Sequence, residues 1–238
     1  MTPAPHKPEK PALVLLPGMD GTGRLFERFV AELAPAERAI IVSYPLERKL
    51  SLDELEEVLE RALPANGSYV LIAESFSGPI AIAHASKRPD RLKALVLCAT
   101  FATAPIPNWL RWLGSFAGML RLPLPKALVR LLLVGDGPDE LVEEVRGTIR
   151  AVEPSVLVHR MRQILTLDVR ERLAALEVPV LYLEGKRDRL VGSRGSAQCE
   201  GSIERFTHAR IDGPHLLLQS RPLEAAEQIE RFLRGEVR

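Results

Sequence analysis

A serine at position 75 lies in the string AESFSG (residues 73–78), which directly follows an apolar run. A small residue, any residue, Ser, any residue and a small residue is the pattern of a nucleophile elbow, in which the Ser sits on a strained turn between a strand and a helix. Ala73 and Ser77 fill the positions where large side chains would clash, although the usual flanking glycines are absent. The string predicts Ser75 as a nucleophile of acyl chemistry. The alternative is that Ser75 and Ser77 only cap a helix.

Ser77 is an alternative nucleophile, but it would need a small residue at position 79, where the chain has Pro79. A Ser at the start of a helix leaves the N–H of the next residue, Phe76, without a helical acceptor, so that this N–H can donate to an oxyanion. Pro79 falls in the first turn of the predicted helix, where its missing N–H costs little.

A serine nucleophile requires a general base, and the base requires a carboxylate that orients it. Asp188 lies in a loop after the apolar run 178–184, and His215 lies in a loop after the run that ends at residue 211. The carboxyl ends of strands are where ligand chemistry collects in open α/β sheets. The chain order Ser75, Asp188, His215 therefore predicts a catalytic triad.

Alternative acids and bases are less well placed. Glu184 falls within the predicted strand, and Asp212 lies on the loop of His215 itself. Asp188 has basic neighbours and could be a solvated surface charge. The remaining histidines occur in the N-terminal tail, in the helix after the elbow, in the helical middle of the chain and inside a strand pattern: His6, His84, His159 and His208.

A glycine-rich loop, LPGMDGTG (residues 16–23), follows the first apolar run. Such a loop before a helix could cradle a phosphate, but it lacks the Lys-Ser/Thr ending of a P-loop and the spacing of a dinucleotide fingerprint. Its place after the first strand is instead typical of a loop that supplies an oxyanion N–H.

With these motifs the chain resembles the α/β-hydrolase superfamily over nearly its whole length. LPGMDGTG together with ESFSG is similar to a small bacterial esterase and lipase-like branch, and to the hydrolase part of plastid esterase and acyltransferase proteins. Many members have His-Gly where this chain has Pro17-Gly18. The resemblance implies that the backbone N–H groups of Met19 and Phe76 form the oxyanion hole.

The elements that must position these residues alternate along the chain. Short apolar runs predict strands at residues 12–16, 39–44, 69–73, 92–98 and 178–184, and a further strand is expected at residues 205–211. Apolar stripes at helical spacing predict helices at residues 24–33, 51–63, 76–87, 192–200 and 222–234. This alternation predicts an α/β fold with a doubly wound, mostly parallel sheet of about six strands.

The alternation stops between residues 101 and 167, where only helical patterns occur. We therefore expect a hydrolase core at residues 1–100 and 168–238, and a helical lid or cap at residues 101–167. Trp109, Trp112 and Phe116 lie in this insertion and are predicted to bind substrate, because an apolar lid suits an apolar acyl group. Basic residues without nearby acids would also suit an anionic membrane surface or an acyl carrier. The alternative is that the apolar residues only pack the lid onto the core.

The composition narrows the class of protein. The chain has 238 residues, 46% of them apolar, and a net charge of +1, which suits a globular protein and gives no indication of nucleic-acid binding. Two cysteines form no disulfide framework, and neither the N-terminus nor any other run suits a signal peptide or a membrane span. We expect a cytoplasmic protein, and the oligomeric state is left open.

These observations predict a carboxylesterase or lipase-like serine hydrolase that cleaves an ester with an apolar acyl group through an acyl-enzyme, with no metal or organic cofactor. An acyltransferase or a thioesterase would use the same triad, because only the acceptor and the leaving group differ. A non-catalytic binding protein on the same fold is the alternative of a different class.

Overall fold

The computed structural model describes residues 10–34, 38–105 and 125–236. Its centre is a six-stranded sheet in the order β2-β1-β3-β4-β5-β6, and every pair of neighbouring strands is parallel. The strands are β1 (Ala12–Leu16), β2 (Ala39–Ile41), β3 (Tyr69–Glu74), β4 (Leu92–Cys98), β5 (Val180–Gly185) and β6 (Phe206–Ile211). The predicted α/β class and the parallel six-stranded sheet are confirmed.

The central strands are apolar along most of their length because both faces of the sheet are covered. In β1, Val14 and Leu16 belong to one apolar cluster, whereas Leu13 and Leu15 belong to the cluster on the opposite face. Successive side chains of a strand point to opposite faces. A continuous apolar run is therefore the sequence expected of a strand between two layers of helices.

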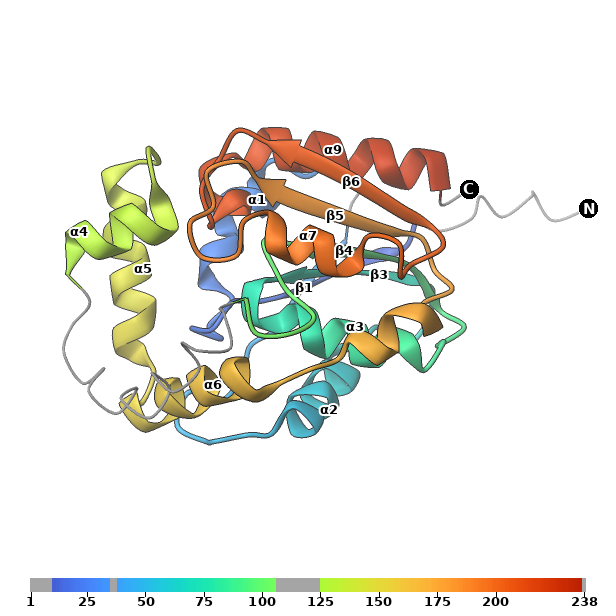
Figure 1. Cartoon of the computed structure of the whole chain (residues 1–238), viewed down its shortest axis with the longest axis horizontal. Helices are drawn as coiled ribbons and strands as arrows, with labels where there is room; N and C mark the ends of the chain where they lie inside the picture. Colours follow the sequence, from blue (N-terminus) through green and yellow to red (C-terminus); the bar gives the residue numbers. More distant parts are fainter. Residues whose placement is uncertain (1–9, 35–37, 106–124, 237–238) are drawn as a thin grey trace, which may run out of the picture.

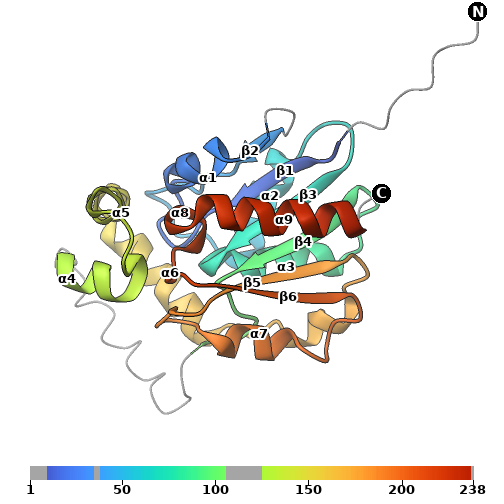
Figure 2. The ribbon, with the colours of Figure 1, turned by 90° about the horizontal axis from the view of Figure 1, so that it is seen from above.

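Helices form these two layers. Helices α2, α3 and α7 contribute to the first cluster, and α1, α8 and α9 to the second. Figure 1 shows α9 above the sheet and α2 and α3 below it, and Figure 2 shows α9 crossing in front of the strands. The helices of the two layers are α1 (Glu27–Ala31), α2 (Leu52–Ala62), α3 (Gly78–Ser86), α7 (Ser193–Cys199), α8 (Leu217–Ser220) and α9 (Pro222–Glu236).

Local signals set several of the element boundaries. Ser51 and Glu54 form a reciprocal capping box at the start of α2, in agreement with the S-x-x-E pattern. The predicted strand at 39–44 is shorter, because β2 ends at Ile41 and the Tyr44 N–H donates to the carbonyl of Gly21. The predicted helix at 24–33 is also shorter, and consists of a 3₁₀ turn, η1 (Arg24–Phe26), followed by α1.

An insertion of helices separates β4 from β5. Its described part contains α4 (Lys126–Val129), the π-helical turn η4 (Arg130–Val134), α5 (Asp139–Ala151) and α6 (Pro154–Thr166), and the 3₁₀ turn η5 (Arg170–Ala175) leads back into the sheet. In Figure 1, α4 and α5 lie beyond the ends of the strands at the left. An isolated antiparallel bridge between Thr103 and Asp168 joins the two ends of this segment. The domain boundaries and the role of this segment as a lid stay predictions.

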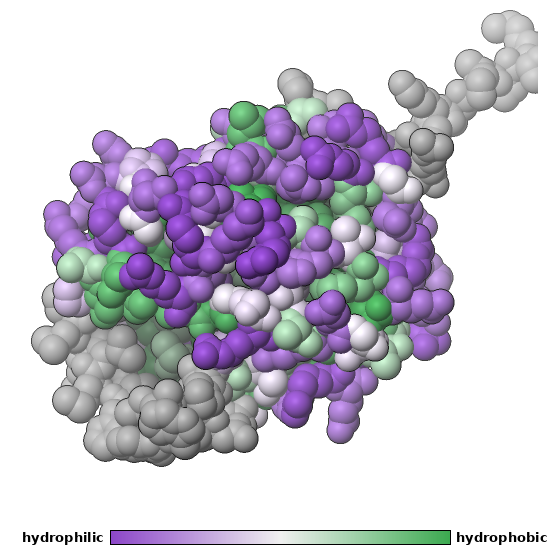
Figure 3. Space-filling model, turned by 45° about the horizontal axis from the view of Figure 1, so that its top comes forward, coloured by the Kyte–Doolittle hydropathy of each residue, from purple (hydrophilic) through white to green (hydrophobic). Residues whose placement is uncertain are grey.

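The face in Figure 3 is mostly hydrophilic, with separate smaller hydrophobic areas. Four large apolar side chains are exposed among the described residues, namely Ile41, Leu128, Leu131 and Leu223. Two of these, Leu128 and Leu131, lie on α4 and η4 of the insertion. No helix within the described ranges has both the length and the apolar character needed to cross a bilayer.

Candidate active site

Ser75 lies on the sharp turn between β3 and α3, and its backbone is left-handed, with φ of 50°. A residue with a side chain adopts this conformation at a cost of roughly 1 kcal/mol or more, and such strain collects at functional sites. The turn is stabilised by the Thr100 hydroxyl, which donates to the Ser75 carbonyl. A Cβ at Gly78 would collide with the Thr100 side chain, which explains the glycine that follows Ser77.

His215 and Asp188 lie beside Ser75. The Nε2 atom of His215 is 2.9 Å from Ser75 Oγ, and its Nδ1 atom is 2.9 Å from Asp188 Oδ2. The side chains of His215 and Asp188 are only 4% and 1% exposed, so both contacts are shielded from water. With an ionised Asp188, the Nδ1–H donates to the carboxylate and Nε2 accepts the Ser75 proton.

The other oxygen of Asp188, Oδ1, accepts backbone N–H bonds from Leu190 and Val191 at 2.8 and 3.1 Å. Burial by itself would raise the pKa of Asp188. The hydrogen bond and charge of His215, together with these two backbone donors, outweigh that effect, so the pKa of Asp188 is lowered overall. Asp188 is therefore ionised at neutral pH, as an orienting carboxylate must be.

Backbone contacts join the Asp188 loop to the His215 loop. The Lys186 N–H donates to the Ile211 carbonyl, and the Arg187 N–H donates to the Gly213 carbonyl. A Cβ at Gly185 would lie 2.5 Å from the Pro214 carbonyl oxygen, so the glycine that ends β5 lets the two loops approach. Because β5 and β6 are neighbours in the sheet, residues 27 positions apart meet at the ends of the two strands.

The loop after β1 passes over the elbow. A Cβ at Gly18 would lie 4.0 Å from the Cβ of Ser75, which places the loop beside the predicted nucleophile. Within the described residues, neither the Met19 N–H nor the Phe76 N–H has a hydrogen-bond acceptor. Both amides are thus free of a backbone acceptor, and their role as oxyanion donors stays a prediction.

Ser77, the alternative nucleophile, is fully buried and has a different set of partners. Its hydroxyl donates to the Pro17 carbonyl and lies 2.7 Å from the Tyr44 hydroxyl. Because the Ser77 proton is given to Pro17, the Tyr44 phenol is the donor in the second bond. Ser77 therefore joins the elbow to the loops after β1 and β2, and its hydrogen bonds within the described residues do not go to His215.

The alternative acids are also occupied elsewhere. Glu184 accepts from Ser196, His208 and Arg210 at 2.7, 3.0 and 3.0 Å. Asp212 pairs with Arg187 at 3.0 Å. The other histidines in the described ranges also have partners of their own. A ring nitrogen of His84 bonds to Tyr69, one of His159 to the Leu50 carbonyl, and one of His208 to Glu184. His6 lies outside the described residues.

Glu74 is a buried carboxyl at the elbow that sequence analysis did not single out. Its Oε2 accepts from the Gln219 amide at 3.0 Å, whereas its buried Oε1 has no partner within the described residues. Burial raises the pKa of Glu74 to about 7, although the Gln219 bond and the His215 charge lower it. The only signal in the sequence was an acidic residue in the variable position before Ser75.

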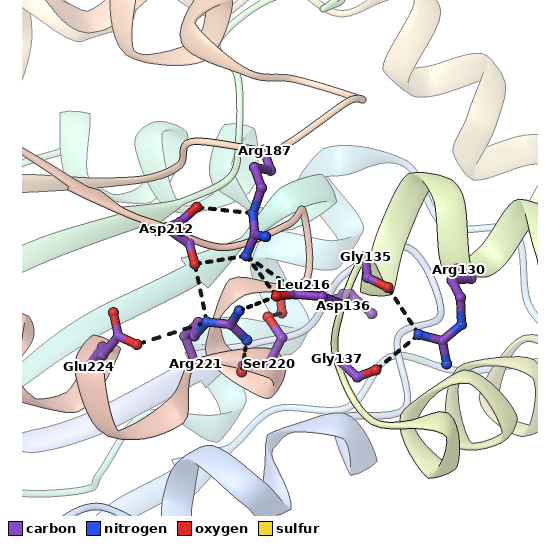
Figure 4. Close-up of polar contacts among 10 residues, drawn as sticks. All are labelled: Arg130, Gly135, Asp136, Gly137, Arg187, Asp212, Leu216, Ser220, Arg221 and Glu224. Atoms are coloured by element: carbon purple, nitrogen blue, oxygen red, sulfur yellow. Dashed lines mark hydrogen bonds and ion pairs between the residues drawn. The ribbon is translucent and has the colours of Figure 1, made fainter.

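Ion pairs attach the insertion to the Asp188 and His215 loops (Figure 4). Asp136, in the turn before α5, contacts Arg187 at 3.0 Å and Arg221 at 2.7 Å. Arg130 donates to the carbonyls of Gly135 and Gly137 at 3.0 Å and thereby holds this turn. The Leu216 N–H, next to His215, donates to the Leu133 carbonyl at 2.9 Å.

Three predicted site residues, Trp109, Trp112 and Phe116, lie outside the described residues, so their role in substrate binding stays a prediction. A hollow of about 600 Å³ lies beside the loop after β2 and is lined by residues such as Tyr44, Arg48 and Val58, but not by Ser75 or His215. We therefore locate the candidate site by the Ser75, His215 and Asp188 contacts and not by this hollow.

One group of side chains has the composition of a metal site. Glu56, Glu60 and His84 offer ligand atoms within 4.8 Å of one another, far along α2 and α3 from the elbow. The Lys87 ammonium lies 2.6 Å from Glu56 Oε1 and already supplies a positive charge there. Cys98 and Cys199 are buried free thiols. Burial raises the pKa of the Cys98 thiol, which keeps it protonated.

Comparisons with known proteins identify relatives of this chain in sequence and in fold. A family model described as "Serine aminopeptidase, S33" matches residues 49–212. The pimeloyl-[acyl-carrier protein] methyl ester esterase of Xanthomonas campestris pv. campestris is 28% identical, over 94% of this chain and 95% of that protein. The biotin biosynthesis bifunctional protein BioHC of Teredinibacter turnerae is 26% identical over 98% of this chain, which spans about half, 46%, of that longer protein.

Solved structures share the fold. An enol-lactonase from Burkholderia xenovorans has a TM-score of 0.79 and 17% identity, with 97% of this chain and 94% of that chain covered. A hydrolase from Pseudomonas aeruginosa has a TM-score of 0.74 and 21% identity, with 94% and 90% covered. At these identities the likeness extends to the arrangement of the sheet and helices.

Proposed function

Since the chain belongs to the family described as serine aminopeptidase, S33, within the α/β-hydrolase superfamily, we propose that it is a carboxylesterase-like serine hydrolase with Ser75 as nucleophile. The observation that carries the proposal is the hydrogen-bonded chain from Ser75 Oγ through His215 to Asp188, with 2.9 Å at each contact. A nucleophile, a base in reach of its proton and a carboxylate on the far nitrogen of the base are the parts that acyl transfer needs.

The reaction proceeds in two acyl transfers. His215 Nε2 removes the Ser75 proton as Oγ attacks the ester carbonyl carbon, and the N–H groups of Met19 and Phe76 receive the oxyanion. His215 then gives the proton to the leaving alkoxide, and an acyl-enzyme remains on Ser75. Water attacks this ester, with His215 again taking the proton, and the carboxylic acid leaves as Ser75 regains its hydrogen. Asp188 stabilises the charged His215 in both halves of the reaction.

We assign the substrate as a carboxylic ester with an apolar acyl group, taken up beneath the helical segment 101–167 as a lid. Leu128 and Leu131, exposed on α4 and η4, support an apolar contact in this region. The Xanthomonas relative is named for a methyl ester on an acyl carrier protein, and a carrier-bound ester therefore belongs in the substrate panel.

The test combines a fluorophosphonate probe with p-nitrophenyl esters of rising chain length, at a pH near neutral. We expect labelling and hydrolysis that Ser75→Ala abolishes and that Ser77→Ala, which keeps the Ser75 and His215 contact, retains. An optimum above acetate would support an apolar acyl pocket. No labelling of the folded wild-type protein would refute the enzyme assignment.

Three further substrates separate the reaction types. Matched thioesters test for a thioesterase, an added alcohol acceptor tests for acyl transfer, and aminoacyl p-nitroanilides test for the peptidase activity in the family description. A kcat/KM for oxyesters that exceeds those for thioesters and anilides, with water as the main acceptor, is the result that we expect.

A further inference from the structure

Arg160 of α6 is a buried arginine that reaches the loop after β1. The residue is only 2% exposed. Its Nη1 donates to the carbonyls of Met19 and Asp20 at 2.9 and 3.0 Å, and its Nη2 donates to the Pro45 carbonyl at 2.9 Å. One side chain of the insertion thus ties together the loops that follow β1 and β2.

These bonds fix the peptide next to the proposed oxyanion donor. The Met19 N–H belongs to the Gly18–Met19 peptide, whose carbonyl accepts from the Gly21 N–H at 3.0 Å. In a trans peptide the N–H points opposite to the carbonyl, so this bond sets the direction of the Met19 N–H. On either side, Ser77 holds the Pro17 carbonyl and Arg160 holds the Met19 carbonyl. The peptide that carries the Met19 N–H therefore lies between two peptides whose carbonyls are held by side-chain hydrogen bonds.

The surroundings of Arg160 are arranged for its charge. Within the described residues no carboxylate lies at ion-pair distance from the guanidinium, and its direct partners are backbone carbonyls. The guanidinium lies 5.8 Å from the centre of the Tyr44 ring, a cation–π contact. Burial lowers the pKa of Arg160, and the opposing effects of Tyr44 and Asp20 offset this shift only in part. A buried charge without an ion-pair partner is costly, and a role that needed only packing would be met by a neutral side chain.

The loop leaves room for this guanidinium. Gly21 has φ of 72°, and a Cβ at this position would lie 2.5 Å from Arg160 Nη1. Glycine is thus required at position 21 for two reasons, its left-handed backbone and its lack of a side chain toward Arg160. Loop and arginine are complementary in shape as well as in hydrogen bonding.

We propose that Arg160 is a positioning residue that holds the Met19 amide in the direction required for oxyanion binding, and that this one side chain thereby links the insertion to the oxyanion hole. This inference rests on the proposed function. It makes Arg160 the link between the insertion and the oxyanion loop, since its guanidinium holds the Met19 and Asp20 carbonyls.

A matched control is available on the same helix. Gln163 of α6 donates to the Leu50 carbonyl at 3.0 Å, as does His159, and neither side chain contacts the loop after β1. Gln163→Leu removes one docking bond of α6 but leaves Arg160 and its partners in place. A defect that is specific to the oxyanion loop should appear in the Arg160 variants only.

The experiment measures kcat, KM and the inhibition constant of an alkyl boronic acid, which forms a tetrahedral adduct on the serine, for wild type, Arg160→Met, Arg160→Lys and Gln163→Leu. Misplacing one oxyanion donor should lower kcat by roughly 10- to 100-fold. We expect this loss in Arg160→Met, an equal loss of boronic-acid affinity and a KM within about threefold of wild type. Arg160→Lys should regain part of the loss, and Gln163→Leu should stay within about threefold.

Several outcomes would overturn the proposal. A folded Arg160→Met protein with wild-type kcat, or a Gln163→Leu protein with the same loss, would show that Arg160 has no specific role. If Arg160→Met does not fold, Arg160→Lys decides by the same comparison of kcat with boronic-acid affinity. Failure of the proposed function is visible separately, because the wild-type protein itself would then be inactive toward esters and the probe.

Discussion

Arg187, the neighbour of Asp188, donates to the carboxylate of Asp136 in the insertion at 3.0 Å (Figure 4). Arg221, which follows α8, contacts the other oxygen of the same carboxylate at 2.7 Å. The Arg187 side chain also reaches the Asp212 carbonyl at 3.1 Å. A single acidic residue of the insertion thus bridges the loop of Asp188 and the residue that separates α8 from α9.

Asp136→Asn should loosen this junction. The two ion pairs are partly exposed, so each contributes less than about 1 kcal/mol to the stability of this contact. The Leu216 amide, which is bonded to Leu133, should therefore exchange its hydrogen up to about fivefold faster. Glu224→Gln is the matched control, because Glu224 contacts Arg221 from α9 and does not touch the insertion. Equal exchange rates in both variants would contradict a specific role for Asp136. Because salt screens exposed ion pairs, 1 M salt should also accelerate exchange of the Leu216 amide in the wild-type protein.

Asp188→Asn should lower kcat by roughly 10⁴-fold at neutral pH, with little change in stability. The Asn oxygen can still accept from Leu190 and Val191, so the loop keeps its shape. The Asn amide would donate to His215 Nδ1, which places the histidine proton on Nε2, where it cannot accept from Ser75. Steady-state kinetics with a p-nitrophenyl ester check this, and a loss below tenfold would mean that Asp188 does not orient the base.

Ser77→Ala should reduce stability but spare the reaction. The substitution leaves the Pro17 carbonyl without its donor and the buried Tyr44 hydroxyl without its acceptor, which costs about 1–3 kcal/mol of the free energy of unfolding. Urea unfolding measures the loss, and fluorophosphonate labelling measures the reactivity of Ser75. Loss of labelling in a folded Ser77→Ala protein, with labelling kept in Ser75→Ala, would exchange the roles of the two serines.

Glu74→Gln should change how stability depends on pH. The folded-state pKa of Glu74, about 7, lies above the ordinary glutamate value of 4.5, so between these values the folded protein binds a proton that the unfolded chain has released. Wild type therefore loses stability as pH rises from about 4.5 to about 7, by a few kcal/mol at most, and the loss is complete above that range.

Glutamine keeps an oxygen for the Gln219 amide but never ionises. The stability of Glu74→Gln relative to wild type should consequently rise between about pH 4.5 and 7 and stay level above. Urea unfolding at a series of pH values measures both proteins under identical conditions. A difference that does not vary across this range would show that Glu74 titrates normally in the fold.

The sequence by itself determined the fold class, because a parallel sheet covered on both faces imposes continuous apolar strands and the covering helices impose apolar stripes. Its predictions failed where contacts along the chain compete with distant ones. The strand predicted at 39–44 ends at Ile41 because Tyr44 is drawn toward Gly21 and Ser77, which are remote in sequence.

The candidate site was predictable in part for the same reason. Ser75, Asp188 and His215 each follow a strand, and parallel strands end at one edge, so their proximity could be expected from topology. Only the tertiary structure decided that Ser75 and His215, 140 residues apart, meet at 2.9 Å. It alone showed Arg160 beneath the loop of Met19, because a buried arginine that binds backbone carbonyls leaves no pattern of partner side chains in the sequence.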